Sequence, residues 1–209
     1  MKIEVVSDIA CPWCAVGVWS LERALADIGS EFPVELSFQP FELNPDMPPE
    51  GEDLVAHLSA KYGIDAAQIR ANQQVIRERG AEVGFDFGER TRIYNTFDAH
   101  RLLHWAALEG RQAELKRALL KAYHGDGKNP SSHAVLIEVA DECGLDKRRA
   151  AEILAGDEYR SAVRAEEQQW RQAGINSVPS VVVDRRYLIQ GAQASEEYAR
   201  ALRQIGSQR

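Results

Sequence analysis

The stretch Cys11-Pro12-Trp13-Cys14 decides how the rest of this 209-residue sequence is interpreted. A short apolar run at residues 3–6, typical of a strand, comes just before it. A helical pattern of apolar residues, up to about residue 29, comes directly after it. A strand, a tight loop and a helix opened by a C-x-x-C pair form an arrangement typical of redox-active thiols. The stretch therefore predicts thiol–disulfide chemistry.

The position of each cysteine in the predicted helix supports this interpretation. Cys11 is expected at the N-cap, where free backbone N–H groups and the positive end of the helix dipole stabilise a thiolate. Pro12 suits the first helical position, because its missing N–H costs nothing there. Cys14 lies one turn further on, within disulfide reach of Cys11. We therefore expect the pair to cycle between dithiol and disulfide.

Three other interpretations compete for the motif. A structural zinc site would need two more soft ligands. The only other cysteine is Cys143, and the nearest histidine pair, His100 and His104, is spaced as on one helix face. A purely structural disulfide would close a very small loop and so stabilise little. The third alternative is that two core cysteines are close by coincidence. Redox chemistry accounts best for the flanking strand and helix, and we expect no metal.

Composition limits the class of protein and its partners. Hydrophobic residues make up 44% of the chain and charged residues 27%, which fits a packed core with a soluble surface. The net charge of −7 argues against nucleic acid as a partner. No run of about 18 apolar residues occurs, so we expect no membrane span. The strand pattern begins almost at once and there are 3 cysteines, so we expect no signal peptide and a cytoplasmic location.

The order of predicted elements suggests one fold with a large insertion. A second strand is predicted at 32–38, a hairpin from strands at 177–183 and 187–189, and a last helix from Ser195 to about residue 205. Between them lie only helical patterns, with Asp65, Asn95 and Ser131 as expected N-caps. The predicted helices are 52–62, 65–83, 95–109, 112–124, 131–143, 147–154 and 158–173.

This β-α-β, helical block, β-β-α order predicts an α/β protein. Segments 1–45 and 174–209 are expected to join into a four-stranded mixed sheet with flanking helices, the thioredoxin-like fold. Segment 46–173 is expected to form an all-helical insertion domain that packs over the active site. We expect a monomer or a homodimer.

Four motifs of the chain belong together: Ser7 to Cys14 with Gly17, and the stretches 38–45, 95–101 and 174–180. Together they resemble the DsbA-like thioredoxin superfamily, and within it the FrnE-like cytoplasmic dithiol oxidoreductases. The resemblance covers essentially the whole chain. It implies that Cys11 attacks substrate disulfides and that Cys14 resolves the mixed disulfide. It also implies a cis peptide at Val178-Pro179 that faces the two sulfurs and offers the Val178 backbone to an extended thiol substrate.

Two departures from relatives leave the reaction open. The dipeptide between the cysteines is Pro-Trp, whereas periplasmic DsbA has Pro-His, so the strong oxidant character of that enzyme is not carried over. The related 2-hydroxychromene-2-carboxylate isomerases and kappa-class glutathione transferases have serine at the position of Cys11, and they bind glutathione there. A glutathione-dependent isomerase or transferase is therefore the alternative enzyme. The alternative from another class is a peptide-binding holdase whose cysteines are incidental. No nucleotide cofactor is expected, because no Gly-rich phosphate loop occurs, and glutathione stays open as a co-substrate.

Further candidate residues follow from the motifs. Trp13 is the aromatic residue expected to touch substrate, with packing across the motif as the alternative. The resemblance places Asn95 and His100 near the site, where His100 would contact a carboxylate or a peptide. The alternative for Asn95 is helix capping alone. Asp8 is expected either to tune the thiols or to be a solvated loop residue.

The remaining tryptophans, histidines and cysteine are assigned to structure. Trp19, Trp105 and Trp170 lie within helical apolar patterns and are expected in the core. His104 fits a half-buried polar residue better than a proton carrier. Cys143 precedes a helix-ending glycine and is expected to be a buried helix residue.

Overall fold

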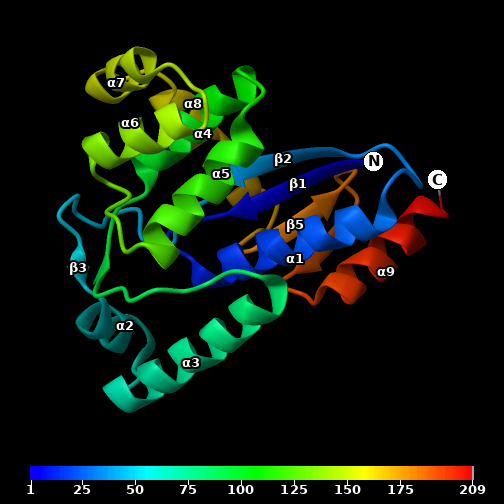
Figure 1. Ribbon diagram of the computed structural model, residues 1–209, viewed down its shortest axis with the longest axis horizontal. Helices are drawn as coiled ribbons and strands as arrows, with labels where there is room; N and C mark the ends of the chain where they lie inside the picture. Colours follow the sequence, from blue (N-terminus) through cyan, green and yellow to red (C-terminus); the bar gives the residue numbers. More distant parts are fainter. Residues whose placement is uncertain (209) are drawn as a thin grey trace.

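A computed structural model of the protein describes residues 1–208 and has a four-stranded sheet at its centre (Figure 1). The strand order is β2-β1-β5-β6. β1 pairs in parallel with β2 and antiparallel with β5, so the sheet is mixed as predicted. All four strands lie in the outer segments of the chain. Their bounds are β1 Lys2–Ser7, β2 Glu35–Pro40, β5 Ser180–Val183 and β6 Tyr187–Gln190.

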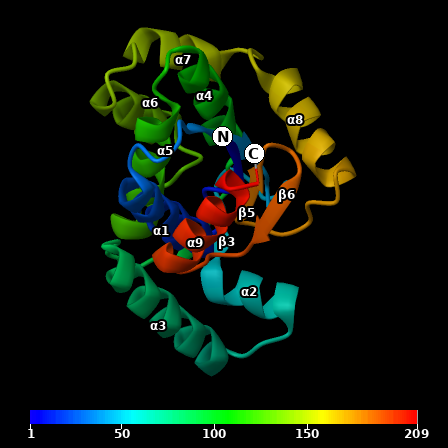
Figure 2. The ribbon, with the colours of Figure 1, turned by 90° about the vertical axis from the view of Figure 1, so that its right-hand side faces the viewer.

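Alternating side chains of β1 separate the two faces of the sheet. Ile3 and Val5 lie in the main core, which α1 (Pro12–Ile28) and α9 (Ser195–Gly206) complete on the near face in Figure 1. Val6 points to the opposite face and packs in a second cluster with Trp170 of α8 (Arg160–Gln172). Figure 2 shows α8 on the far side of the sheet from α1 and α9. This alternation is the period of two that a strand requires.

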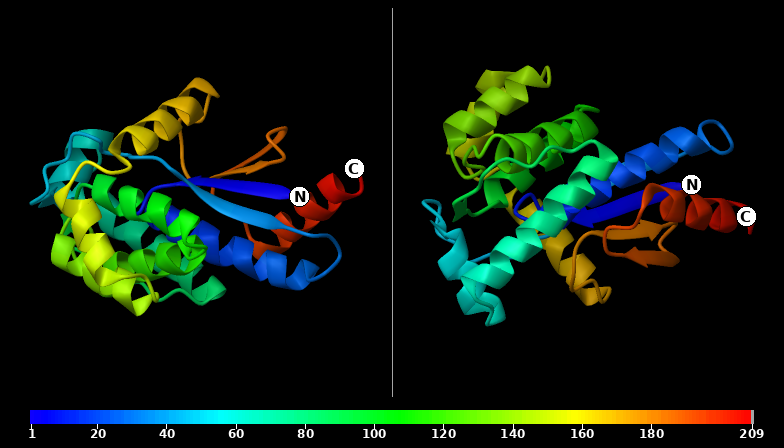
Figure 3. Two further views of the ribbon diagram at one scale, coloured as in Figure 1. Left: turned by 90° about the horizontal axis from the view of Figure 1, so that it is seen from above. Right: turned by 60° about the horizontal axis from the view of Figure 1, so that its bottom comes forward.

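The helices between β2 and β5 form two groups. One bundle comprises α4 (Phe97–Leu108), α5 (Gln112–Leu120), the π-helix η1 (Lys121–Gly125), α6 (His133–Glu142), α7 (Lys147–Ala155) and α8. The other group is α2 (Leu54–Tyr62) and α3 (Ala66–Val83), which lie below α1 in Figure 1 and come forward in the right-hand view of Figure 3. The bundle and the sheet share one hydrophobic core. Within residues 1–208, no helix is long and apolar enough to cross a membrane.

Several predicted boundaries are wrong for local reasons. The strand predicted at 32–38 begins at Glu35, because its register with β1 starts with the pair Lys2 and Glu35. Pro33 lies before the strand and accepts a hydrogen bond from the Met1 ammonium at 2.7 Å. The hairpin strand predicted from 177 begins at Ser180, directly after a cis peptide bond between Val178 and Pro179. The cis bond that the resemblance implied is therefore present.

The helical block also differs in detail from its prediction. The helix predicted at 112–124 changes at Leu120 into a turn of π-helix. The N-cap of α6 is Ser132, whose hydroxyl accepts from the Val135 N–H, and not Ser131. The N-cap of α4 is Thr96 and not Asn95. Two short strands, β3 (Glu52–Asp53) and β4 (Arg92–Ile93), pair antiparallel and were not predicted. A pair of two-residue strands is too short to leave a periodic pattern.

Candidate active site

The two cysteines stand at the start of α1, directly beyond the end of β1. Cys11 is the N-cap residue with an extended backbone, and Pro12 begins the helix, as the sequence predicted. The Cys14 N–H donates to the Cys11 carbonyl oxygen at 3.1 Å. The two thiols are free and contact each other. Such a pair, one helical turn apart, has the spacing that a reversible disulfide needs.

Burial gives the two thiols different properties. Cys14 is completely buried, whereas 5% of Cys11 is exposed. Burial, together with the neighbouring Cys11 thiol, raises the pKa of Cys14 well above its ordinary value. The charge of Lys116 acts in the opposite direction on the same thiol. Cys11 is therefore the thiol within reach of an incoming substrate, and Cys14 is protected behind it.

The loop with the cis-proline closes the site from the other end of the chain. The Cys11 thiol donates to the Val178 carbonyl oxygen, with a distance of 3.7 Å between sulfur and oxygen. Pro179 packs on Gly17 of α1, where a Cβ atom would come within 2.9 Å of the Pro179 ring. Within the loop, the Ser180 hydroxyl donates to the Ser177 carbonyl oxygen at 2.8 Å. The loop is thus held against the N-terminal turn of α1.

Cys11 opens into a cavity of about 650 Å³. Its walls come from the start of α1, the loop before β5, and the helices α2 and α3. The apolar part of the lining includes Leu54, Leu58, Ile64, Ile69 and Ile76. A volume of this size is typical of pockets for small molecules or for a few residues of a peptide.

Two cations, Lys61 and Arg90, are also among the lining residues of this cavity. The Lys61 ammonium donates to the Leu43 carbonyl oxygen at 2.8 Å and to Asn44 Oδ1 at 2.6 Å. Partial burial lowers the pKa of Lys61. The cavity therefore combines an apolar surface with groups that attract a carboxylate. The sequence analysis missed both residues. Lys61 lies in α2, whose helical pattern does not reveal which face will turn toward Cys11, and Arg90 lies in the loop between α3 and β4, which has no periodic pattern.

The predicted substrate-binding residues divide into two groups in the structure. Pro12, Trp13 and Val178 line the cavity beside Cys11, and 36% of Trp13 is exposed. Pro179 lies behind Val178, against α1. Trp105 and Trp170 are buried as predicted, while Trp19 is half-buried against the core.

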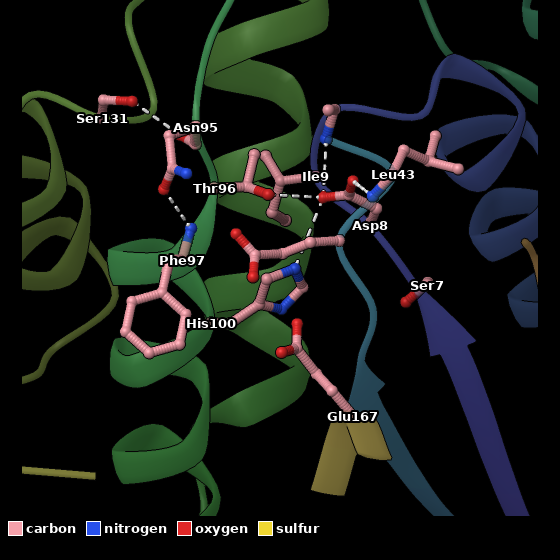
Figure 4. A network of polar contacts seen from close by, with 12 residues as sticks. Ser7, Asp8, Ile9, Leu43, Asn95, Thr96, Phe97, His100, Ser131 and Glu167 are labelled. Carbon is pink, nitrogen blue, oxygen red and sulfur yellow. Dashed lines mark hydrogen bonds and ion pairs between the residues drawn. The ribbon is translucent and has the colours of Figure 1, made fainter. Parts of the chain in front are cut away.

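Asn95 and His100 do not line this cavity. Asn95 Oδ1 accepts from the Phe97 N–H at 2.9 Å, and the Asn95 carbonyl oxygen accepts from the Ser131 hydroxyl at 2.6 Å. Figure 4 shows this chain of contacts at the start of α4. His100 is buried, and the carboxylate it contacts is Asp8, a residue of the chain itself. Both side chains therefore bind other residues of the chain and do not face the cavity beside Cys11.

The buried Asp8 carboxylate connects three segments of the chain by hydrogen bonds: the loop before Cys11, the segment after β2 and the start of α4. Its Oδ1 accepts from the Ala10 N–H at 3.1 Å and from the Thr96 hydroxyl at 2.7 Å, and lies 3.4 Å from His100 Nε2. Its Oδ2 accepts from the Leu43 N–H at 2.8 Å (Figure 4). Burial alone would raise the pKa of Asp8. The hydrogen bond and the charge of His100, together with the hydrogen bonds from Leu43 and Thr96, outweigh burial, so the pKa of Asp8 is lowered. The alternative of a solvated loop residue is wrong, since Asp8 is fully buried.

A buried acidic pair lies next to this network. Glu42 and Glu167 are almost fully buried, and Arg164 forms ion pairs with both. In Figure 4 the Glu167 carboxylate points toward the His100 ring. Burial and the charge of Glu167 raise the pKa of Glu42 to about 8. Sequence reasoning did not find this pair, because its members lie in different segments and no spacing connects them.

The remaining candidates lie apart from the cysteine pair. His104 forms an ion pair with Glu166 at 3.1 Å on the partly exposed side of α4. Cys143 is half-buried rather than buried, at the C-cap of α6. Among residues 1–208, no group of three or more His, Cys, Asp or Glu side chains is arranged to hold a metal ion.

The fold and the site together define a class of protein. A dithiol at a helix N-terminus that faces a cis-proline loop, on a mixed sheet with a helical insertion, is a thioredoxin-like thiol–disulfide site. The chain belongs to the family of the DSBA-like thioredoxin domain, whose model matches residues 2–203.

Individual relatives agree with this membership. A probable DsbA oxidoreductase from Streptomyces coelicolor is 36% identical and superposes with a TM-score of 0.94, over 100% of this chain and 91% of that chain. The uncharacterized protein YwbO of Bacillus subtilis is 26% identical over 97% of this chain and 96% of its own length. The structure of a 2-hydroxychromene-2-carboxylate isomerase has a TM-score of 0.75 at 11% identity, over 100% of this chain and 97% of that chain, which shows a shared fold.

Proposed function

We propose that this protein is a thiol–disulfide oxidoreductase in which Cys11 is the nucleophile and Cys14 the resolving thiol. The observation that carries the proposal is the contact between the Cys11 thiol and the Val178 carbonyl oxygen at the wall of the cavity, with Cys14 buried behind. An accessible thiol at a helix N-terminus is suited to attack, because the helix dipole stabilises its thiolate. A buried partner thiol one helical turn away is suited to attack the mixed disulfide between Cys11 and the substrate.

The reaction consists of two exchanges. The Cys11 thiolate attacks one sulfur of a substrate disulfide, a bond forms between Cys11 and that sulfur, and the other sulfur leaves as a thiolate. The Cys14 thiolate then attacks Cys11, the internal disulfide forms, and the second substrate sulfur leaves. The substrate is reduced by two electrons and the protein is oxidised by two. Run backward, the same steps oxidise a dithiol substrate.

The cavity suggests the kind of substrate. Its apolar walls and its cations Lys61 and Arg90 suit a thiol or disulfide with an apolar body and a carboxylate. The Val178 backbone, at the cavity wall beside Cys11, suits an extended peptide or a peptide-like thiol such as glutathione. Protein and small-molecule thiols therefore both fit the proposed activity.

Reduction of insulin by dithiothreitol tests the proposal directly. Wild type is expected to accelerate precipitation of the insulin B chain, and Cys11→Ser and Cys14→Ser should each abolish the acceleration. Cys143→Ser is the matched control, because Cys143 lies at the end of α6 and outside the site. The proposal fails if wild type has no effect on insulin, or if both active-site variants keep it.

A glutathione-dependent isomerase is the second candidate. The shared fold with 2-hydroxychromene-2-carboxylate isomerase favours it, as does a cavity of about 650 Å³, large enough for a small aromatic substrate. Such an enzyme needs a polar group at Cys11 to orient glutathione and does not need Cys14. Conversion of a chromene carboxylate with added glutathione, unimpaired in Cys14→Ser, together with no insulin reduction, would replace the first proposal by this one.

A further inference from the structure

A second cavity adjoins the one beside the active-site cysteines. It has a volume of about 380 Å³, and three arginines, Arg70, Arg77 and Arg90, are among its lining residues. Arg90, Gln73 and Ile76 line both cavities, so the two spaces share a wall. We call the second space the arginine cavity. The two thiol–disulfide exchanges at the cysteine pair do not by themselves involve it.

The helical period of α3 gives the two cavities different walls. Ile69, Asn72 and Ile76 are spaced by three and four residues and face the larger cavity. Arg70 and Arg77, almost two full turns apart, line the arginine cavity from a neighbouring face of the same helix. A helix rises about 1.5 Å per residue, so the backbone positions of the two arginines are about 10 Å apart along α3.

The three arginines of this cavity have no carboxylate partner among residues 1–208. Arg77 donates to Gln74 Oε1, a neutral group, at 3.1 Å. Arg90 lies 5.0 Å from the centre of the Tyr123 ring. The side chains of Arg70 and Arg77 are exposed. An arginine with no acid beside it keeps its attraction for an incoming anion.

The lining of both cavities is positive although the chain as a whole is acidic. Glu89 is the one acidic residue among the lining residues of the arginine cavity, against three arginines. The lining of the larger cavity includes Lys61 and Arg90 and no aspartate or glutamate. The chain has a net charge of −7, so this concentration of unpaired cations differs from its average character. Such a local field raises the concentration of anions at the site.

Several guanidinium groups in one cavity suit a phosphate better than a carboxylate. The planar fork of arginine donates two parallel hydrogen bonds to a phosphate. A phosphate group carries about −1.5 to −2 charges at neutral pH and three acceptor oxygens, so it is able to accept from more than one arginine. A single carboxylate would be satisfied by Lys61 or Arg90 in the larger cavity and would leave Arg70 and Arg77 unused.

We propose that the protein acts on a long, flexible thiol or disulfide that carries a phosphate at the end remote from its sulfur. The sulfur lies at Cys11, the phosphate lies in the arginine cavity, and the arm between them contacts Ile69 and Ile76 in the wall of the larger cavity. The inference rests on the proposed oxidoreductase function and names the class of its substrate. A thiol that carries only carboxylates would use the larger cavity alone.

Reduction of such a disulfide balances in electrons and atoms. The S–S bond of the substrate breaks, and the bond between Cys11 and Cys14 forms. Two electrons pass from the cysteine sulfurs to the substrate sulfurs, and the two protons of the cysteine pair end on the two product thiols. The phosphate is unchanged, so the arginines bind it and take no part in the redox step.

Two disulfides that differ only in phosphate test the proposal. Pantethine is the disulfide of pantetheine, and the disulfide of 4′-phosphopantetheine carries one phosphate more on each half. Reduced protein is mixed with an excess of either disulfide, quenched with acid, alkylated and analysed by mass spectrometry, which gives the rate of oxidation of the cysteine pair. The phosphorylated disulfide should reach half of its maximal rate at a roughly 10-fold lower concentration than pantethine. Equal half-saturation concentrations in wild type would overturn the proposal.

Arg70→Gln and Arg77→Gln should each remove most of this preference and leave the half-saturation concentration of pantethine unchanged. Both side chains are exposed, so the variants are expected to fold. Arg79→Gln is the matched control, because it removes the same charge from the same helix. Arg79 pairs with Glu82 at 2.7 Å and lines neither cavity. An equal loss of preference in Arg79→Gln, or an unchanged preference in both cavity variants, would contradict the assignment.

Inorganic phosphate distinguishes a phosphate on the substrate from a free anion that binds on its own. At constant ionic strength, set with sodium chloride, inorganic phosphate should raise the half-saturation concentration of the phosphorylated disulfide and leave that of pantethine unchanged. Faster reaction of pantethine on addition of phosphate would mean that the cavity binds a free anion, and the proposal would fall.

Failure of this inference is distinguishable from failure of the oxidoreductase function. A wild type that reduces insulin and is oxidised equally well by both disulfides refutes only the phosphate site. A wild type that is oxidised by neither disulfide and does not accelerate insulin precipitation refutes the function on which the inference rests.

Discussion

The Cys11 thiol and the Val178 carbonyl oxygen lie 3.7 Å apart, although 167 positions separate the two residues in the chain. The contact depends on how closely the cis-proline loop approaches α1. That approach is possible because residue 17 has no side chain, so the Pro179 ring rests on the backbone of α1. The geometry at Cys11 is therefore controlled by a glycine two turns along the same helix.

The first prediction concerns that glycine. In Gly17→Ala the new Cβ would lie 2.9 Å from Pro179 Cγ, so the loop must move away from Cys11. We expect insulin reduction to fall and the free energy of unfolding to decrease by about 1–3 kcal/mol. Urea denaturation and the insulin assay would measure both. Gly156→Ala is the control, since its Cβ meets nothing closer than 3.4 Å, and a Gly17→Ala variant as active as this control would contradict the prediction.

The second prediction concerns the order of thiol modification. Cys11 is partly accessible, whereas Cys14 is fully buried and has a raised pKa. Iodoacetamide at neutral pH should therefore alkylate Cys11 first, and in Cys11→Ser the Cys14 thiol should stay unmodified far longer. Mass spectrometry of tryptic peptides after timed quenching would show the order. Modification of Cys14 ahead of Cys11 would reverse the assigned roles.

The third prediction concerns Asp8. In Asp8→Asn one acceptor oxygen becomes an NH₂ group that faces existing donors, so we expect a loss of about 1–3 kcal/mol in the free energy of unfolding at pH 7. The pKa of Asp8 in the folded protein is lowered, so its contribution is present above the usual value of 3.8 and is lost as the pH falls through the folded value.

The difference in stability between wild type and Asp8→Asn should accordingly shrink in acid. Denaturant titrations at pH 7 and pH 3 would measure it. Asp46→Asn, at an exposed position, is the control and should be neutral at both pH values. A difference that grows toward pH 3 would show that the carboxylate is not stabilised by its hydrogen bonds.

The fourth prediction concerns Glu42. Its pKa in the folded protein is raised from 4.5 to about 8, so between these values the folded state holds a proton that the unfolded state has lost. Stability therefore falls as the pH rises through this window. Glu42→Gln removes the effect, so the variant should gain stability relative to wild type from pH 5 to pH 8, on the order of a few kcal/mol.

Urea denaturation at the two pH values would test the Glu42 prediction. Glu50→Gln, an exposed glutamate, should show no such gain. Equal pH dependence in wild type and Glu42→Gln would mean that Arg164 keeps Glu42 ionised throughout.

The sequence predicted the order of elements well because local chemistry controls it. Cys11 and Pro12 begin α1, and the strongly periodic helices after residue 52 all exist. The cis bond before Pro179 was expected only through the family resemblance. From the residues alone, an ordinary trans proline that opens an edge strand is the preferred interpretation.

The parts of the site that the sequence did not predict depend on tertiary packing. Asp8 is charged and stands in a loop, which by pattern alone suits a solvated position. It becomes a buried anchor because Thr96 and Leu43, from distant segments, supply donors to its carboxylate. By the sequence pattern of α5, the charged side chain of Lys116 would be expected at the surface. Only the packing of α5 against β2 shows that it is buried.

The position of β1 in the middle of the sheet has a consequence for synthesis. Its first partner, β2, follows closely, but its second partner, β5, ends at Val183. At a translation rate of about 5–20 residues per second, one edge of β1 waits roughly 10 to 35 seconds for its partner to be made. An open strand edge is a template for wrong pairing. The nascent chain therefore carries Cys11 and Cys14 beside an unpaired strand edge until β5 has been made.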